Sequence, residues 1–173
     1  LNWPNSIIEL QKNWIGKSEG ALVKFVIDGT NKENGADSIT VFTTRIDTIY
    51  SGTFVILAPE HPYIQKYQDS ITNISEVNAY IDQVKNKTDI ERTDKGNKTG
   101  VELKGLKVIN PATQEKLPVW VSDFVLGAYG TGAVFADAHD KRDFDMAKAY
   151  NIPLKVSLKP TTENAEATLE QIE

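Results

Sequence analysis

Two short stretches of the sequence combine residue types that could hold and position a small polar molecule. The first, TTRIDT, runs from Thr43 to Thr48 and follows an apolar, alternating segment. Hydroxyls, a cation and a carboxylate therefore stand at the end of an expected strand, where loop residues are well placed to line a pocket. The simpler interpretation is a β-branched strand end with a surface ion pair between Arg45 and Asp47. The residues by themselves leave both interpretations open.

The second stretch, AHDKRDF, places Asp140 and Asp143 at the beginning of an expected helix. An Asp at this point accepts hydrogen bonds from the free amides of the first turn and complements the helix dipole, which explains Asp140. Asp143 is not needed as a second cap, so its carboxylate could bind a substrate ammonium by a charge-assisted hydrogen bond. A metal cluster of Asp140, Asp143 and Asp145 lacks the calcium-loop pattern, and no metal is predicted.

Other kinds of chemistry have less support in the sequence. YGTG, from Tyr129 to Gly132, indicates a tight turn or a close backbone approach, but its spacing matches neither the phosphate loop nor the dinucleotide fingerprint. Cys is absent and no Ser stands in a G-x-S-x-G pattern, so a reaction would use a positioned water rather than a side-chain nucleophile. His139 is either a general base or a structural imidazole.

Composition bounds the class of protein. The chain has 173 residues, of which 40% are hydrophobic and 25% charged, which is typical of one globular domain. Lys and Arg number 19 against 24 Asp and Glu, a net charge of -5, whereas nucleic-acid binders usually carry the opposite sign. Any RNA contact must then be local or driven by another part of a longer protein. The chain begins at Leu1 without Met, which also leads us to expect a piece of a longer protein. No long apolar run or signal peptide is present, so no membrane partner is expected.

The elements that must position these residues are mostly short strands. Amphipathic spacing predicts helices over residues 6–14, 75–85 and 140–150, capped by Asn5, Ser75 and Asp140. Strands are expected over residues 21–28, 38–44, 53–58, 101–103, 107–109, 118–121, 133–136 and 152–158. Residues 31–37 and 110–116 read as turns, and residues 88–99 as a mobile surface loop or, alternatively, a lid. The predicted fold class is α+β, with a β-barrel core and peripheral α-helices.

Five motifs, in order, resemble the editing insertion of leucyl-tRNA synthetases, the bacterial and organellar type best. They are NWIGKSEG (13–20), TTRIDT followed by Gly52, LAPEHP (57–62), PVWVSDFVLGAYGTGAV (118–134) and AHDKRDFDMAKAYNIP (138–153). The insertion of the valine enzyme carries Glu where Asp47 stands, and the amino-acid-activating motifs of the family are absent here. The resemblance implies an editing domain over residues 1–160, in which residues 1–16 form an entry linker and helix, and an acidic tail or linker over residues 161–173.

The resemblance also implies a function. A synthetic site discriminates one methylene by only about 1–3 kcal/mol, so a second site must hydrolyse wrong products. The implied reaction is hydrolysis, by an ordered water, of tRNA(Leu) mischarged with norvaline, isoleucine or methionine, with steric exclusion of leucine. Its partners are the aminoacylated acceptor end of tRNA(Leu) and the remainder of the synthetase, without a cofactor, in a cytoplasmic or organellar enzyme. The alternative is a module that binds the acceptor end without hydrolysing the ester.

Roles for residues follow from the same resemblance. Asp143 is expected to hold the α-ammonium of the wrong amino acid, Thr43 and Thr44 to line the site, and Thr48 to exclude leucine by its branched side chain. Residues of the adenosine pocket are expected to be Leu126, Tyr129 and Phe135. Residues that support the loops or touch the tRNA are expected to be Arg45, Asp47, Asp140 and Arg142.

The sequence departs from the family pattern at three places. Ile46 stands where Pro is usual, and Phe135 where Met is commoner. Ala136-Asp137 replaces a longer segment that usually contains Val-Pro. This shortening lies between the expected adenosine wall and Asp143, so the sequence leaves the local backbone path open.

Overall fold

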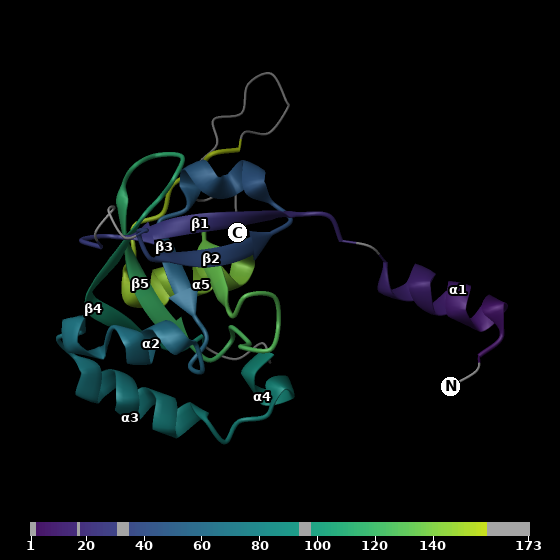
Figure 1. Ribbon diagram of the computed structural model, residues 1–173, viewed down its shortest axis with the longest axis horizontal. Helices are drawn as coiled ribbons and strands as arrows, with labels where there is room; N and C mark the ends of the chain where they lie inside the picture. Colours follow the sequence, from purple (N-terminus) through teal and green to yellow (C-terminus); the bar gives the residue numbers. More distant parts are fainter. Residues whose placement is uncertain (1–2, 17, 31–34, 94–97, 159–173) are drawn as a thin grey trace.

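The computed structural model describes residues 3–16, 18–30, 35–93 and 98–158. A six-stranded mixed sheet in the order β2-β1-β4-β5-β3-β6 forms its centre, with helices packed around it (Figure 1). The strands are β1 (Ala21–Ile27), β2 (Ser38–Thr43), β3 (Phe54–Leu57), β4 (Gly100–Ile109), β5 (Lys116–Ser122) and β6 (Ala133–Ala136). The helices are α1 (Asn5–Ile15), α2 (Pro62–Lys66), α3 (Ile74–Val84), α4 (Asp89–Thr93) and α5 (Lys141–Tyr150), with 3-10 turns η2 (Ile46–Ser51) and η3 (Gln68–Ser70).

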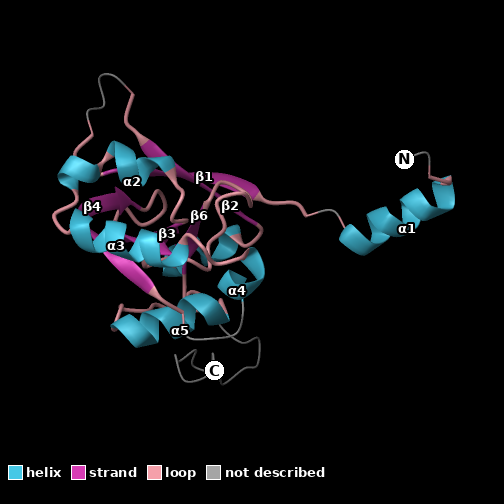
Figure 2. Cartoon of the chain, turned by 90° about the horizontal axis from the view of Figure 1, so that it is seen from below, coloured by secondary structure: helices cyan, strands magenta, loops and turns pink. Residues whose placement is uncertain are grey.

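Strand β3 shows why the sheet is buried on both faces. All four of its side chains are buried, as its continuous apolar run predicts. Val55 and Leu57 join the larger core cluster with α3, whereas Phe54 and Ile56 join a second cluster with Met146 of α5. Figure 2 accordingly shows α2 and α5 on opposite sides of the strands. The strand pairs in parallel with β5 and antiparallel with β6, which makes the sheet mixed.

The prediction of a closed β-barrel is wrong, because the sheet stays open between its two edge strands. Among the described residues no hydrogen bond joins β2 to β6, although the sheet curls until their backbones come near each other. Side chains of both edges instead line a cleft, and backbone pairing across it would require the strands to approach to about 4.8 Å. The α+β class itself is confirmed.

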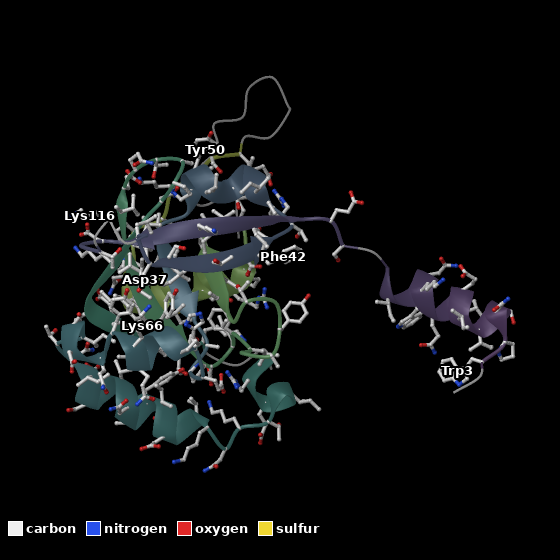
Figure 3. The ribbon with its side chains drawn as sticks, viewed as in Figure 1. Trp3, Asp37, Phe42, Tyr50, Lys66 and Lys116 are labelled. Atoms are coloured by element: carbon white, nitrogen blue, oxygen red, sulfur yellow. The ribbon has the colours of Figure 1, made fainter. Side chains whose placement is uncertain are left out.

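Helix α1 stands apart from the rest of the chain (Figure 2). It contains no buried residue, and Trp3, labelled in Figure 3, precedes it at the far end of the molecule. The predicted stop is confirmed at Gly16, which takes the left-handed φ of 70°. The predicted cap is off by one residue, because Pro4 is the N-cap and Asn5 already belongs to the helix.

Four further expectations differ from the structure. Residues 101–103 and 107–109 belong to one strand, β4, whose pairing with β5 shifts register between Glu102 and Lys107. Residues 152–158 form no strand. The expected loop at 88–99 contains α4, which begins with a reciprocal pair in which Thr88 N–H donates to Glu91 and Glu91 N–H donates to Thr88 Oγ1. Helix α3 begins at Ile74, after Asn73 rather than Ser75.

The remaining expected elements are in place or lie outside the described residues. The turn at 110–116 joins β4 to β5, where Ile109 pairs with Lys116. Asp37 precedes β2 and forms an ion pair of 2.5 Å with Lys66 of α2, which ties the strand to that helix (Figure 3). Residues 31–34 of the expected turn, 94–97 of the expected loop and the tail at 161–173 are outside the described residues.

Gly105 is the glycine on which the register shift of β4 depends. Its φ is +97°, and a Cβ there would collide with the carbonyl oxygen of Ser70. Gly29 also has a positive φ, +81°, but no described atom lies within 4 Å of its would-be Cβ.

We expect Gly29→Ala to lower the free energy of unfolding by about 1–2 kcal/mol through backbone strain alone. Gly105→Ala should cost roughly 1–3 kcal/mol more because of the collision. Urea denaturation of both variants measures the difference, and equal losses would show that the collision is relieved.

Candidate functional site

The gap between the two sheet edges forms a cleft of about 580 Å³, a volume typical of small-molecule sites. One wall comes from the end of β2 and from η2, the second from β6 and the beginning of α5, and the third from the segment after β5. Of the residues singled out in the sequence, the cleft is lined by Thr43, Thr44, Arg45, Thr48, Leu126, Tyr129, Phe135, His139, Asp140, Arg142 and Asp143. Asp47 is not among the lining residues.

The first wall is shaped by local hydrogen bonds within TTRIDT. Thr43 Oγ1 accepts the backbone N–H of Arg45 at 3.0 Å, which turns the chain out of β2 and into η2. Asp47 accepts two hydrogen bonds from Arg45, at 3.0 and 2.9 Å, and this guanidinium lowers the pKa of Asp47. The surface ion pair and the pocket wall, which the sequence left as alternatives, therefore coexist. Thr48 is only 2% exposed, so its side chain belongs to the bottom of the wall.

The second wall begins with the helix cap that the sequence predicts. Asp140 Oδ1 accepts hydrogen bonds from the backbone N–H groups of Arg142 and Asp143, at 2.9 and 3.4 Å. Burial raises the pKa of Asp140, but its hydrogen bonds and charge attraction with Arg142 outweigh burial and leave the pKa below its ordinary value. Asp140 thus stays ionised and already has its partners.

Asp143 differs from Asp140 in having no close cation among the described residues that ion-pairs with it. Its side chain is buried, and the hydrogen bond it accepts from the N–H of Asp137 is long, 3.4 Å. Burial raises the pKa of Asp143 well above its ordinary value, and the charges of Asp140 and Asp137 raise it further. A buried carboxylate in this state is stabilised by an arriving cation, which makes it a candidate for ligand binding.

The third wall is held from outside the cleft by Arg92 of α4. The Arg92 guanidinium donates to the carbonyl oxygens of Asp123 and Val125, at 2.6 and 2.8 Å, and to Glu60 Oε1 at 2.7 Å. Phe124, Val125 and Leu126, which line the cleft, are carried by this clamped segment. Tyr129 follows and is 80% exposed at the rim, where an aromatic ring is available to a ligand. Gly130 and Gly132 take positive φ, as the tight-turn interpretation of YGTG predicts.

Sequence reasoning missed several lining residues, and Asp137 is the most informative. It is buried, and its Oδ2 accepts a hydrogen bond of 2.7 Å from Thr48 Oγ1. The only sequence signal was the shortened segment Ala136-Asp137. His139 also lines the cleft, but its Nε2 accepts the backbone N–H of Ser157 at 3.2 Å, which favours the structural imidazole over a general base. Phe42, labelled in Figure 3, lies on the cleft side of β2 and comes from an ordinary strand pattern.

Metal centres and membrane-spanning helices are two other features that a chain of this kind could carry. No group of three or more His, Cys, Asp or Glu side chains in the described part of the chain could hold a metal ion. No helix in that part has both the length and the apolar character required to cross a bilayer.

The raised pKa of Asp143 predicts how the free energy of unfolding depends on pH. Between the unfolded-state and native pKa values the native state binds more protons, so the free energy of unfolding falls as pH rises through that interval. Asp143→Asn removes this titration and should make the chain more stable than wild type at neutral pH but not at acidic pH. Thermal unfolding across this pH range measures the effect. Asp145→Asn, exposed on the same helix, is the control, and an Asp143→Asn variant less stable at neutral pH would contradict the electrostatic account.

Comparison with known proteins places the chain in a family. Residues 12–173 match the sequence profile described as "Leucyl-tRNA synthetase, editing domain". Leucine–tRNA ligases of Nitratidesulfovibrio vulgaris are similar to it, at 44% identity over 166 residues for strain DP4 and 45% over 163 residues for strain Hildenborough. These alignments cover 95% and 93% of the chain but only 19% of each relative, so the chain spans about one fifth of their length.

A solved structure gives the same answer. The crystal structure of a ternary complex of Agrobacterium radiobacter K84 agnB2 LeuRS, tRNA and LeuAMS matches 96% of this chain and 19% of that one, with a TM-score of 0.73 and 33% identity. The order of motifs, the curled open sheet and the acidic cleft therefore have one explanation: the chain belongs to the family of leucyl-tRNA synthetase editing domains.

Proposed function

We propose that the cleft hydrolyses the ester bond of tRNA(Leu) mischarged with norvaline, isoleucine or methionine and excludes leucine. One observation carries the proposal: Thr43 and Thr48 line the same cleft as Asp143, which lies far from them in the sequence. The editing-domain family gives the reaction class, and the solved relative contains tRNA. The cleft volume of about 580 Å³ accommodates an aminoacyl group with its terminal adenosine.

Asp143 is the proposed anchor for the substrate. The α-ammonium of an aminoacyl ester is a compact cation, and a charge-assisted hydrogen bond to the buried carboxylate fixes the attached ester carbonyl. An aminoacyl ester is already an activated acyl group, so holding it beside an ordered water is sufficient for hydrolysis without a covalent intermediate. Thr43 and Thr44 line the opposite wall and offer hydroxyls to the substrate or to the terminal ribose.

Thr48 is the proposed barrier to leucine. The side chain is buried at the bottom of the cleft wall, and its hydroxyl is engaged by hydrogen bonds to protein groups. What remains to meet the substrate is the methyl group of a β-branched side chain, which is stiff about χ1. A leucyl side chain branched at Cγ collides with this methyl group, whereas norvaline, isoleucine and methionine distribute their carbons differently.

The rest of the cleft is proposed to receive the end of the tRNA. Leu126 and the exposed ring of Tyr129 provide apolar and aromatic surface of the kind on which a nucleobase stacks, whereas Phe135 lines the same cleft but is only 6% exposed. Arg45 and Arg142 are more than half exposed, so they are available to the RNA backbone while remaining paired with Asp47 and Asp140. Asp47 and Asp140 act through these arginines and through the loop and helix they hold.

We expect Asp143→Ala to lower deacylation of isoleucyl-tRNA(Leu) by at least about a hundredfold, because it removes the buried partner of the ammonium. The measurement is release of labelled isoleucine by the synthetase that carries this domain. Asp145→Ala, exposed on the same helix, is the matched control and should deacylate at the wild-type rate. Undiminished turnover by Asp143→Ala would overturn its role, and a wild-type domain that binds the acceptor end without deacylating it would establish the binding-only alternative.

We expect Thr48→Ala to admit leucine. Loss of the methyl-bearing branch should raise deacylation of leucyl-tRNA(Leu) by roughly 10–200-fold, the range that one methylene contributes to discrimination. The same variant should deacylate isoleucyl-tRNA(Leu) at close to the wild-type rate, since Asp143 is unchanged. Thr113→Ala, in the turn between β4 and β5 and outside the residues that line the cleft, controls for loss of a threonine elsewhere. If leucyl-tRNA(Leu) stays intact with Thr48→Ala, the steric barrier lies at another residue.

A further inference from the structure

Asp137 contacts both groups on which the proposed function depends. It lies in the short connection between β6 and α5, and only 6% of it is exposed. Its carboxylate Oδ2 accepts a hydrogen bond from Thr48 Oγ1 at 2.7 Å, and its backbone N–H donates to Asp143 Oδ2 at 3.4 Å. One residue thus touches the proposed barrier with its side chain and the proposed anchor with its main chain.

The hydroxyl of Thr48 has one proton and two acceptors within reach. The carbonyl oxygen of Arg45 lies at 3.0 Å and belongs to the same turn, whereas the Asp137 carboxylate lies at 2.7 Å and comes from the opposite wall. Hydrogen bonds to a carboxylate are shorter and roughly twice as strong as those to a neutral acceptor. The Thr48 hydroxyl therefore donates its hydrogen bond to Asp137 in preference to the carbonyl oxygen of Arg45. With Oγ1 held in this way, the three staggered rotamers reduce to one and the Thr48 methyl group has one position.

Asp137 is itself held in place. Its second oxygen, Oδ1, accepts the backbone N–H of His139 at 2.6 Å, which is the geometry of an Asx turn. His139 in turn accepts the N–H of Ser157. Both carboxylate oxygens are therefore engaged with protein groups, so the residue is built to hold the protein and not to bind the ligand directly.

We propose that Asp137 is the positioning residue for leucine exclusion: it sets the separation between the Thr48 methyl group and the Asp143 carboxylate. The anchor fixes one end of the amino acid and the barrier limits the other, so the distance between them defines the longest side chain that fits. Thr48 and Asp137 are 89 positions apart in sequence, and their hydrogen bond joins the two walls of the cleft. The inference rests on the proposed function and adds to it the residue that controls its size limit.

The first test compares Asp137→Ala with Asp137→Asn in the synthetase that carries this domain. Asp137→Ala should raise deacylation of leucyl-tRNA(Leu) about tenfold relative to that of isoleucyl-tRNA(Leu), because the Thr48 methyl group is released. The change should appear as a leucine-specific gain and not as an equal loss of kcat for both esters. Asp137→Asn keeps an oxygen acceptor and should retain most of the discrimination. If Asp137→Ala and Asp137→Asn lose discrimination between leucine and isoleucine equally, the hydrogen bond to Thr48 does not position the barrier. The effect would then come from the negative charge of Asp137.

The second test is a double-mutant cycle between Asp137 and Thr48. Thr48→Val preserves the branched shape but removes the hydroxyl, so it removes the group through which Asp137 acts. Asp137→Ala should then change the leucine-to-isoleucine ratio about tenfold in the wild type and by less than about twofold in the Thr48→Val background. Additive effects would show that Asp137 does not act through Thr48. Asp82→Ala, exposed on α3, is the matched control for loss of a carboxylate.

A third measurement separates failure of this inference from failure of the proposed function. The carbon-13 shift of the Thr48 γ-methyl group reports the side-chain rotamer without any turnover. We expect a single-rotamer shift in the wild-type chain and Asp137→Asn, and an averaged shift in Asp137→Ala. An unchanged shift in Asp137→Ala would overturn the inference even if the enzyme edits, whereas a changed shift without deacylation by the wild type would overturn only the proposed function.

Discussion

A buried carboxylate without a close cationic partner is the constraint around which the cleft is organised. Isolated buried charges are costly, and proteins usually pair them or exclude them. Here Asp143 is buried beside two other acidic residues, Asp137 and Asp140, which raise its pKa further. Arg142 relieves this arrangement only in part, because its guanidinium donates to Asp140. Under the proposed function, the α-ammonium of the substrate offsets this electrostatic cost, and the cleft thereby favours a cation.

The open edge of the sheet is the second condition for the site. A closed barrel would satisfy the backbone of β2 and β6 by pairing them, but it would also fill the space in which Thr43 and Asp143 face a common cleft. The structure instead protects the two edges differently. β2 ends in a turn in which Thr43 binds the N–H of Arg45, and β6 is only four residues long. Short edge strands and local turns limit unwanted pairing with other strands. The unpaired edges of β2 and β6 therefore leave the space that forms the cleft.

The sequence was a good guide wherever local chemistry decides the outcome. The cap at Asp140, the stop at Gly16 and the buried run of β3 each follow from rules that involve only neighbouring residues, and all three are confirmed. The clustering of TTRIDT with the α5 residues did not follow from composition or periodicity; it was expected from the resemblance to a family. Local patterns cannot bring these segments together because long-range strand order, β2-β1-β4-β5-β3-β6, decides which edges meet.

The failures have identifiable physical causes. The barrel was expected because many short strands are compatible with closure, but periodicity contains no information on whether the last strand pairs with the first. Residues 152–158 alternate like a strand, yet they are held by contacts such as that of Ser157 with Ser51 and with His139. Asp137 was passed over because one carboxylate in an apolar stretch has no motif. Its partner, Thr48, is 89 positions away, and only the folded chain shows the pair.

The charge of the cleft also bears on the tRNA end that the proposed function places there. Asp137, Asp140 and Asp143 repel phosphate, and the chain as a whole carries a net charge of -5, so a tRNA backbone gains nothing by approaching the bottom of the cleft. The only Lys or Arg side chains that line the cleft within the described residues are Arg45 and Arg142, and both are exposed and already paired with carboxylates. Under the proposed function, the ammonium end of an aminoacyl-tRNA enters the cleft while its phosphates stay outside. Because affinity for RNA depends mainly on phosphate neutralisation, the proposed function expects this chain to contribute little of it.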